Sequence, residues 1–316
     1  MKRLLITGGS GFLGKELAKK LKKNYEIILA SRNNGLNQEA EAITGCKTIP
    51  MDITNKDSVY DGFNAFKPEI VIHAGATKYV NISEEQPLEC IDVNILGSTN
   101  IARASIEKGV HTVIGISTDK AAPPVPHIYG NSKAIMERMF CSLDYSNDTN
   151  FSCVRFGNIA WSTGSVFPIW KRMMLDEGLI KSTGPHMKRF FFSVSDAADL
   201  VIRNLEHIDL TKGKVLSMKM CASKISDFLD VWKKLYGTSW IDVGKRLGET
   251  THESMIGEIE LNFTTQHNLD GVEHFLTSTR ELSDSPVDKI FTTESADQHT
   301  ESEMIKLIEL GMNFDE

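Results

Sequence analysis

The sequence predicts an α/β protein built on a doubly wound parallel sheet. Five short apolar runs alternate with amphipathic segments whose apolar residues recur at helical spacing. The runs are residues 3–7, 26–30, 69–73, 111–116 and 151–156. Repeated strand–helix–strand units of this kind place helices on both faces of one parallel sheet. After residue 157 glycine and proline punctuate shorter segments, which predicts a smaller, interleaved second unit towards the C-terminus.

Length and composition restrict the class of protein. The chain has 316 residues, of which 41% are hydrophobic and 24% charged, which excludes a disordered chain. This length suits about two domains. The net charge of −7, without a basic run, argues against nucleic-acid binding, which needs clustered cations. No apolar stretch approaches the ~20 residues of a membrane span, so we expect no span.

The cysteines and histidines carry no metal or disulfide pattern. The five cysteines are widely spaced and form no CxxC pair, which fits neither a disulfide framework nor a structural zinc site. The histidines show no ligand spacing either. We therefore expect reduced cysteines, a cytoplasmic protein and no metal.

A glycine-rich turn follows the first apolar run and opens the first helix. Gly8, Gly11 and Gly14 stand three residues apart in the segment TGGSGFLG. Glycines are ordinary turn formers, but between a strand and a helix they allow the backbone to approach a pyrophosphate closely. The helix N-terminus then favours the anion. The pattern predicts a Rossmann-like, dinucleotide-binding sheet.

The end of the second apolar run indicates which dinucleotide binds. Ser31 and Arg32 stand there, without the carboxylate that would hold the ribose hydroxyls of NAD. A guanidinium suits the 2′-phosphate of NADP, although a solvated surface arginine is the alternative. Asp52 could accept a hydrogen bond from the adenine amino group or stabilise a turn. We expect NADP as the cofactor, in preference to NAD.

These patterns divide the chain into two units. Residues 1–160 form the predicted NADP-binding domain, and residues 191–220 are expected to return to it. Residues 161–190 and 221–316 form the smaller unit, to which we assign the substrate.

A proton-transfer group is predicted near the fourth apolar run. Tyr129 and Lys133 share a helix face, so the ammonium is expected to lower the pKa of the phenol. Thr118 follows the strand at the sheet edge that faces ligands and could donate to the same substrate oxygen. Asp119 and Lys120 add an acid and a base that a simple dehydrogenase does not need, unless they form a solvated pair in a loop.

Ordered motifs over most of the chain resemble one family of enzymes. Besides TGGSGFLG they are HAGATKYV (73–80), NILGSTN (94–100), STDKA (117–121), YGNSK (129–133), VRFGNIAWSTGSVFP (154–168), KRFF (188–191) and RLGETTHE (246–253). With them the chain is similar to extended short-chain dehydrogenases/reductases. Among these it resembles the C5-inverting UDP-N-acetylglucosamine 4,6-dehydratases of the polysaccharide biosynthesis protein family.

The resemblance implies roles for individual residues. Asp119 would be the general acid and Lys120 the general base, while Thr118, Tyr129 and Lys133 would form the redox triad. The residues expected to bind the cofactor are Gly8, Ser10, Gly11, Phe12, Leu13, Gly14, Ser31, Arg32, Asp52, Ile53, Ala74, Gly75, Ala76, Lys78, Tyr129 and Lys133. Those expected to bind a UDP-sugar are Lys78, Arg155, Asn158, Ser165, Val166, Arg189, Arg246 and Glu249.

The implied reaction oxidises C4, eliminates water across C5 and C6 and returns the hydride to C6, giving a UDP-4-keto-6-deoxy-N-acetylhexosamine. Lys120 could remove the C5 proton if burial or its neighbours lower its pKa. The alternative is a UDP-N-acetylglucosamine 4-epimerase, which needs only Thr118, Tyr129 and Lys133. A non-catalytic NADP-sensing protein on the same fold is a further alternative. We also expect a homo-oligomer, a dimer or larger.

Overall fold

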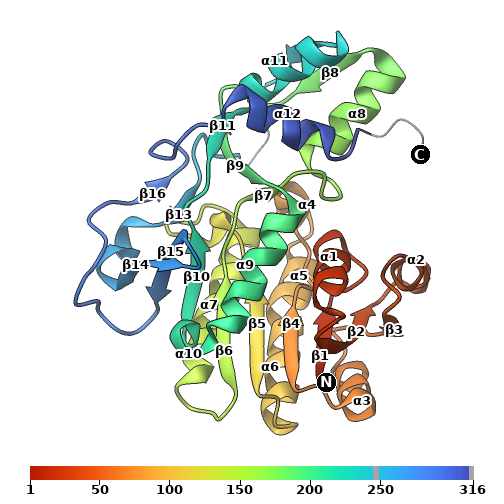
Figure 1. Cartoon of the computed structure of the whole chain (residues 1–316), viewed down its shortest axis with the longest axis vertical. Coiled ribbons are helices and arrows are strands. Elements are labelled where there is room, and N and C mark those ends of the chain that lie inside the picture. Colours follow the sequence, from red (N-terminus) through yellow and green to blue (C-terminus); the bar gives the residue numbers. More distant parts are fainter. Residues whose placement is uncertain (245–248, 313–316) are drawn as a thin grey trace.

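The fold is organised around one large sheet covered by helices on both faces (Figure 1). The computed structural model describes residues 1–244 and 249–312, and within them this sheet has nine strands in the order β14-β15-β10-β6-β5-β4-β1-β2-β3. From β10 to β3 all neighbours pair in parallel, whereas β15 and β14 pair antiparallel. The predicted α/β class with a doubly wound parallel sheet is confirmed.

The elements of the main body have these bounds. Its strands are β1 (Lys2–Thr7), β2 (Tyr25–Ser31), β3 (Lys47–Pro50), β4 (Ile70–His73), β5 (Thr112–Ile116), β6 (Asn150–Val154), β10 (Lys214–Met218), β14 (Thr264–Leu269) and β15 (Val272–Ser278). One face carries α1 (Phe12–Leu21), α2 (Asn34–Thr44) and α9 (Val194–Glu206), followed by α10 (Ile208–Thr211). The other carries α3 (Lys56–Phe66), α6 (Gly97–Glu107) and α7 (Ile128–Asp144). The connection from β4 to α6 contains α4 (Val80–Glu85), α5 (Pro87–Ile91) and a π-helical turn, η1 (Asp92–Leu96).

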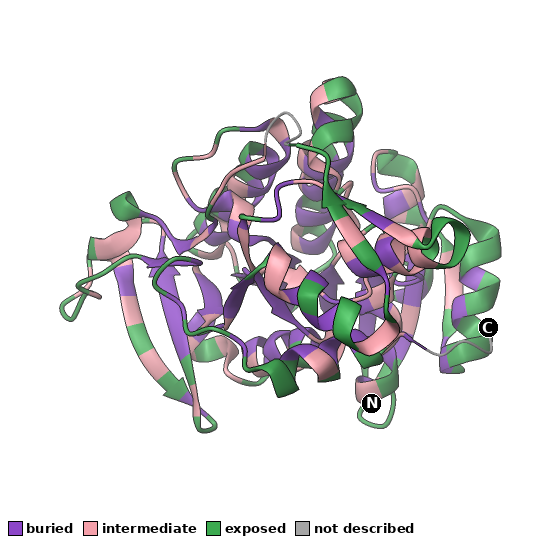
Figure 2. Cartoon of the chain, turned by 90° about the horizontal axis from the view of Figure 1, so that it is seen from above, coloured by how far each residue is buried: buried purple, intermediate pink, exposed green. Residues whose placement is uncertain are grey.

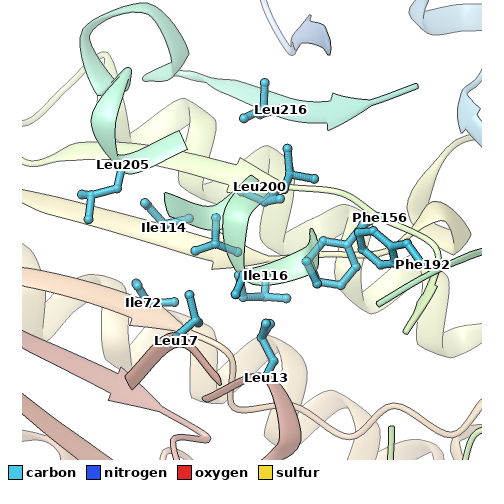
Figure 3. Packing of buried hydrophobic residues seen from close by; sticks show 14 of the residues in the cluster. Leu13, Leu17, Ile72, Ile114, Ile116, Phe156, Phe192, Leu200, Leu205 and Leu216 are labelled. Carbon is cyan, nitrogen blue, oxygen red and sulfur yellow. The ribbon is translucent and has the colours of Figure 1, made fainter. Parts of the chain in front are cut away.

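Apolar spacing decides which face each helix buries. Helix α1 buries Leu13, Leu17 and Leu21, which are one turn apart, and ends on basic residues that suit a helix C-terminus. Figure 3 shows leucines of α1 and α9 packed with the isoleucines of the central strands, namely Leu13, Leu17, Leu200, Leu205, Ile72, Ile114 and Ile116. Each fully buried side chain of this kind contributes about 1.5–3 kcal/mol, so the core rather than helix propensity holds these helices in place.

A smaller unit, uppermost in Figure 1, has its own core. It is built from α8 (Val166–Glu177), α11 (Ile225–Tyr236) and α12 (Glu301–Glu309) around large aromatic side chains. Its short strands are β7 (Asn158–Ile159), β8 (Leu179–Ser182), β9 (Lys188–Phe192), β11 (Ala222–Lys224) and β12 (Ser239–Asp242). Strands β13 (Ser254–Ile256) and β16 (Phe291–Thr292) pair separately. Figure 2 shows buried residues concentrated in the strands and exposed residues on the outer helix faces.

The C-terminal part of the chain contributes to both units. Within residues 191–220, α9 covers the central sheet and β10 joins it. Strands β14 and β15 fall within residues 221–316, which we assigned to the smaller unit, yet they extend the central sheet beyond β10. They do so because β15 pairs along all of β10 and buries Phe275 and Leu276 in the main core. The assignment of cofactor and substrate to separate units stays a prediction.

No helix among the described residues is both long and apolar enough to cross a bilayer.

A buried histidine joins three elements at the carboxyl end of β4. His73 Nδ1 lies 2.7 Å from Thr7 Oγ1 on β1, and its Nε2 lies 3.0 Å from Ser98 Oγ on α6. Complete burial, reinforced by the positive charge of Lys133, lowers the pKa of His73 to about 3. His73 is therefore neutral in the folded protein at physiological pH.

We predict that His73 makes the protein less stable as the pH falls below 6.5, the ordinary pKa of histidine. The unfolded chain then binds a proton that the folded chain does not bind, so the free energy of unfolding decreases by up to about 1.4 kcal/mol per pH unit. In His73→Asn this contribution is absent. Urea unfolding between about pH 6.5 and 4 compares the two proteins. Equal pH slopes would contradict a neutral buried His73.

Candidate active site

A cavity of about 550 Å³ opens at the carboxyl edge of the sheet, where doubly wound folds bind ligands. Its walls come from the turns after β1, β2, β4 and β5, from α7 and from residues 156–165. Of the residues predicted to bind the cofactor, those that line it are Gly8, Ser10, Gly11, Phe12, Leu13, Gly14, Ser31, Arg32, Ile53, Ala74, Gly75, Ala76, Lys78, Tyr129 and Lys133. Of the residues predicted to act in catalysis or to bind substrate, the cavity is also lined by Thr118, Lys120, Asn158 and Ser165.

The charges around the cavity favour an anionic ligand. No aspartate or glutamate is among the residues that line it, whereas Arg32, Lys78, Lys120 and Lys133 are. The cavity lining is therefore positively charged, although the net charge of the chain is −7. Within residues 1–244 and 249–312, no group of three or more His, Cys, Asp or Glu side chains could hold a metal ion.

The turn after β1 has the geometry of a phosphate cradle. Gly8 has a φ of +67°, and a Cβ there would lie 2.8 Å from the carbonyl group of Ala74. A Cβ at Gly14 would lie 2.5 Å from the carbonyl oxygen of Gly9. Helix α1 begins after Gly11 without a side-chain cap, so the amides of its first turn are open to a ligand. These features fit the pyrophosphate of a dinucleotide.

Where β2 ends, the cavity is bordered by hydroxyl groups and by the cation of Arg32. Ser31 Oγ lies 2.6 Å from Ser10 Oγ and donates to Asn37 Oδ1 at 2.7 Å. Arg32 is exposed at the rim, and its guanidinium has no partner among the described residues. Asp52 does not line the cavity, since its Oδ1 accepts from the amide and hydroxyl of Thr54. Of the two roles considered for Asp52, the structure shows the turn-stabilising one.

Tyr129 and Lys133 lie on one face of α7, as predicted, but their electrostatics differ from the prediction. Burial raises the pKa of Tyr129 to about 12, and Lys120 and a Thr118 hydrogen bond offset this only in part. Burial also lowers the pKa of Lys133 to about 8. Among the described residues the Lys133 ammonium has one hydrogen-bond partner, the sulfur of Met136 at 3.8 Å. A buried cation without an oxygen acceptor fits the ribose hydroxyls of a bound dinucleotide.

The predicted acid–base pair forms a buried ion pair in which Lys120 lines the cavity and Asp119 lies behind it. Asp119 Oδ1 accepts from Lys120 Nζ and from Thr118 Oγ1, each at 3.0 Å, while Oδ2 is buried without a partner among the described residues. Burial raises the pKa of Asp119, although Lys120 opposes this. For Lys120 burial acts to lower the pKa, but Asp119 and Glu253 raise it above its ordinary value. The condition stated for Lys120 as a base, a lowered pKa, is therefore not met in this arrangement.

Glu253 is a member of this cluster that the sequence did not assign to it. Its Oε1 lies 3.7 Å from Lys120 Nζ and 3.7 Å from Arg189 Nε, and it accepts from Thr250 Oγ1 at 2.9 Å. Although burial opposes it, Lys120 and Arg189 hold the pKa of Glu253 below its usual value. The signal available was its place at the end of the motif RLGETTHE. Tyr79, inside HAGATKYV, lines the cavity and was missed in the same way.

Comparison with known proteins identifies the family of the chain. The family profile described as "Polysaccharide biosynthesis protein" matches residues 4–271. The chain belongs to this family. UDP-N-acetylglucosamine 4,6-dehydratase (inverting) from Campylobacter jejuni is 33% identical over 274 residues, which cover 83% of this chain and 80% of that relative. UDP-glucose 4-epimerase from Rickettsia bellii is 31% identical over 274 residues, covering 82% of this chain and 79% of the relative.

Among solved structures, Pen from Bacillus thuringiensis superposes on this chain with a TM-score of 0.89. The superposition covers 97% of this chain and 96% of that chain at 24% sequence identity. At this identity the likeness shows the shared fold.

Several residues predicted to bind substrate are not among those that line the cavity. Arg189 is turned to the backbone, donating to Thr250 O at 2.8 Å and to Lys188 O at 2.8 Å. Glu249 accepts from Thr183 Oγ1 at 3.3 Å. Val166 begins α8 directly after the cavity wall, and Arg246 lies outside the described residues.

Arg155 is the clearest correction, because its guanidinium is buried in a structural ion-pair network. It donates to both carboxylate oxygens of Glu137, at 2.9 and 2.6 Å, and to both of Glu260, each at 2.9 Å. A fifth bond reaches Met255 O at 2.9 Å. With 1% of its surface exposed and every donor direction occupied, Arg155 does not contact substrate.

We predict that Arg155→Leu lowers the free energy of unfolding by about 3–5 kcal/mol, because it leaves two buried carboxylates unpaired. Chemical denaturation measures the loss. The control is Lys181→Leu, which removes an exposed pair with Glu177 and should cost less than about 1 kcal/mol. An Arg155→Leu protein of unchanged stability that binds substrate poorly would instead support direct substrate contact.

Proposed function

We propose that this protein is a UDP-N-acetylglucosamine 4,6-dehydratase that inverts C5. The observation that carries the proposal is the hydrogen-bonded pair Asp119–Lys120 beside Thr118 at the wall of the cavity. Oxidation of a hydroxyl needs one base, whereas loss of water needs a further acid and base. The name of the relative from C. jejuni, at 33% identity, supports the same reaction.

The chain's own residues can perform each proton transfer. The C5 hydrogen of a hexose becomes acidic once C4 is a ketone, and a bound nicotinamide dinucleotide supplies the hydride acceptor and donor for that redox chemistry. Tyr129 takes the proton of the C4 hydroxyl, with Thr118 holding the oxygen. Lys120 then takes the C5 proton while Asp119 protonates the C6 hydroxyl, so that the C6–O bond breaks, water leaves and a C5–C6 double bond forms.

The short Asp119–Lys120 contact prepares both groups for that step. In the resting arrangement Lys120 is an ammonium, because Asp119 and Glu253 keep its pKa high. Transfer of one proton over the 3.0 Å between Lys120 Nζ and Asp119 Oδ1 yields a neutral amine and a carboxylic acid. No proton is exchanged with solvent, and burial favours the uncharged pair. This single proton transfer from Lys120 to Asp119 therefore prepares the general acid and the general base at once.

We further propose NADP rather than NAD as the dinucleotide. The free Arg32 guanidinium at the rim suits a 2′-phosphate, and no aspartate or glutamate lines the cavity to hold the ribose hydroxyls of NAD. The cradle of glycines and the buried Lys133 support a dinucleotide of either kind.

The proposed substrate region joins the cavity at residues 158–165. Asn158 and Ser165 line the cavity there together with Lys78, whose pKa is lowered by partial burial. Val166 follows at the start of α8, where backbone amides favour a diphosphate. On this proposal the first 160 residues hold the cofactor and the smaller unit contributes the sugar-nucleotide contacts.

The 4-epimerase remains the second candidate. The relative from R. bellii, named a UDP-glucose 4-epimerase, is 31% identical to this chain. That reaction uses Thr118, Tyr129 and Lys133 and has no role for the buried Asp119–Lys120 pair, which is why dehydration is preferred.

We also propose a homo-oligomer with a reduced, cytoplasmic setting. Leu88, Ile91 and Leu96 are exposed on α5 and η1, and Ile135 is exposed on α7, which packs against both. Exposed apolar side chains on adjacent helices suit a second copy of the chain. All five cysteines are free, which supports a reducing environment.

We predict that Lys120→Ala lowers the dehydration rate by about 10²–10⁴-fold, because the C5 proton loses its base. The first redox step needs Tyr129 instead, so reduced nicotinamide should accumulate after mixing with UDP-N-acetylglucosamine. Stopped-flow absorbance and product NMR measure the two steps. Tyr129→Phe is the matched control and should abolish both. A near-normal dehydration rate in Lys120→Ala would contradict the proposed mechanism.

We predict that Arg32→Ala weakens NADP binding by about ten- to hundredfold, the loss expected for charge-assisted hydrogen bonds to a phosphate. NAD binding should stay the same, because NAD lacks that phosphate. Calorimetric titration with both dinucleotides measures the ratio. Arg103→Ala, an exposed arginine on α6 outside the cavity, serves as control. Equal loss for both dinucleotides would contradict a 2′-phosphate contact.

A further inference from the structure

The turn that connects β7 to α8 has an unusual backbone conformation. Trp161 has a φ of +65°, in the left-handed region that side chains other than glycine rarely adopt. Gly164, three residues later, has a φ of +77°. Such a residue persists only where its surroundings fix it. The contacts of Trp161 and Gly164 therefore determine the shape of this turn.

On one side the turn is fixed by the C-terminal helix. Trp161 Nε1 donates to Leu307 O of α12 at 2.9 Å. The indole ring fills the space beside Gly311, where any Cβ would overlap it. Lys171 of α8 donates to Gly311 O at 3.2 Å, and its ammonium lies 6.0 Å from the centre of the indole ring. Figure 1 shows α12 beside α8 in the smaller unit.

On the other side the turn is fixed by the wall of the cavity. The ring of Tyr79 occupies the space that a Cβ of Gly164 would need. Both residues line the cavity, and Tyr79 belongs to the loop after β4. The turn is thus held between the main body, through Tyr79, and α12, through Trp161.

The residues of this turn that line the cavity carry hydrogen-bond donors. Ser162, Thr163, Gly164 and Ser165 all line it. Ser165 occupies the N-cap position of the twelve-residue helix α8 but makes no capping bond, and its Oγ is buried without a partner among the described residues. The first-turn amides of α8 lack an intrahelical acceptor. Hydroxyl and amide donors at a helix N-terminus favour phosphate oxygens.

We propose that α12 positions this turn for the diphosphate of the substrate, with Trp161 and Gly311 as positioning residues that do not themselves touch the ligand. The inference rests on the proposed function, since it takes a nucleoside diphosphate as the ligand. It makes the C-terminal helix a determinant of substrate affinity, although α12 lies outside the cavity wall. Displacing the indole shifts Ser165 and the start of α8, and leaves the cradle of α1 unchanged.

The test is Gly311→Ala, with UDP as the probe in calorimetric titration of the full-length protein. A methyl group there displaces the indole, so the Kd for UDP and the KM for UDP-N-acetylglucosamine should rise about tenfold, as for loss of one charge-assisted hydrogen bond. The Kd for NADP, kcat and the thermal midpoint should be retained. Leu310→Ala, at the exposed neighbouring position, is the matched control and should bind UDP like the wild type.

A second variant distinguishes loss of the contact between Trp161 and α12 from a general loss of stability. Trp161→Phe keeps an aromatic ring but loses the bond to Leu307, so it should weaken UDP binding less than Gly311→Ala, again with NADP unaffected. Equal loss of UDP and NADP binding with a lower thermal midpoint in both variants would overturn the inference. So would wild-type affinity for UDP in both. A wild-type protein that binds NADP but no UDP would overturn the proposed substrate class and this inference with it.

Discussion

The buried guanidinium of Arg155 is the interaction on which the arrangement of the site depends. It joins the end of β6 to Glu137 on α7, the helix that carries Tyr129, and to Glu260 in the segment after β13. That segment approaches the turn of Asp119 closely enough that a Cβ on Gly257 would overlap Pro123. Because a buried ion that loses a partner costs several kcal/mol, these elements keep one relative placement.

That placement separates charges in a way that suits the proposed chemistry. The cavity wall carries cations, while the carboxylates of Asp119 and Glu253 lie behind it. Of the two carboxylates, burial raises the pKa of Asp119, whereas Lys120 and Arg189 hold the pKa of Glu253 below its usual value against the effect of burial. Two carboxyl groups whose pKa values are shifted in opposite directions beside one amine fit the proposed acid–base roles.

The parts of the fold that depend on local patterns were predictable, and those that depend on distant partners were not. Alternating apolar runs and the glycine turn identified the parallel sheet and the cradle, and the contiguous residues Thr118, Asp119 and Lys120 did meet in space. Arg155 was misassigned because its partners lie 18 and 105 residues away, where no spacing rule applies. The hairpin β14–β15 joined the central sheet for the same reason, through long-range pairing with β10. A left-handed φ at Trp161 leaves no trace in composition or periodicity.

The most direct test of the central claim is proton NMR of the purified wild-type protein with UDP-N-acetylglucosamine in D2O, without added reductant. The account predicts a new C6 methyl signal with deuterium at C5, and a C5 coupling pattern that reports inversion. Formation of UDP-N-acetylgalactosamine with its C5 proton intact would contradict dehydration and establish the epimerase instead.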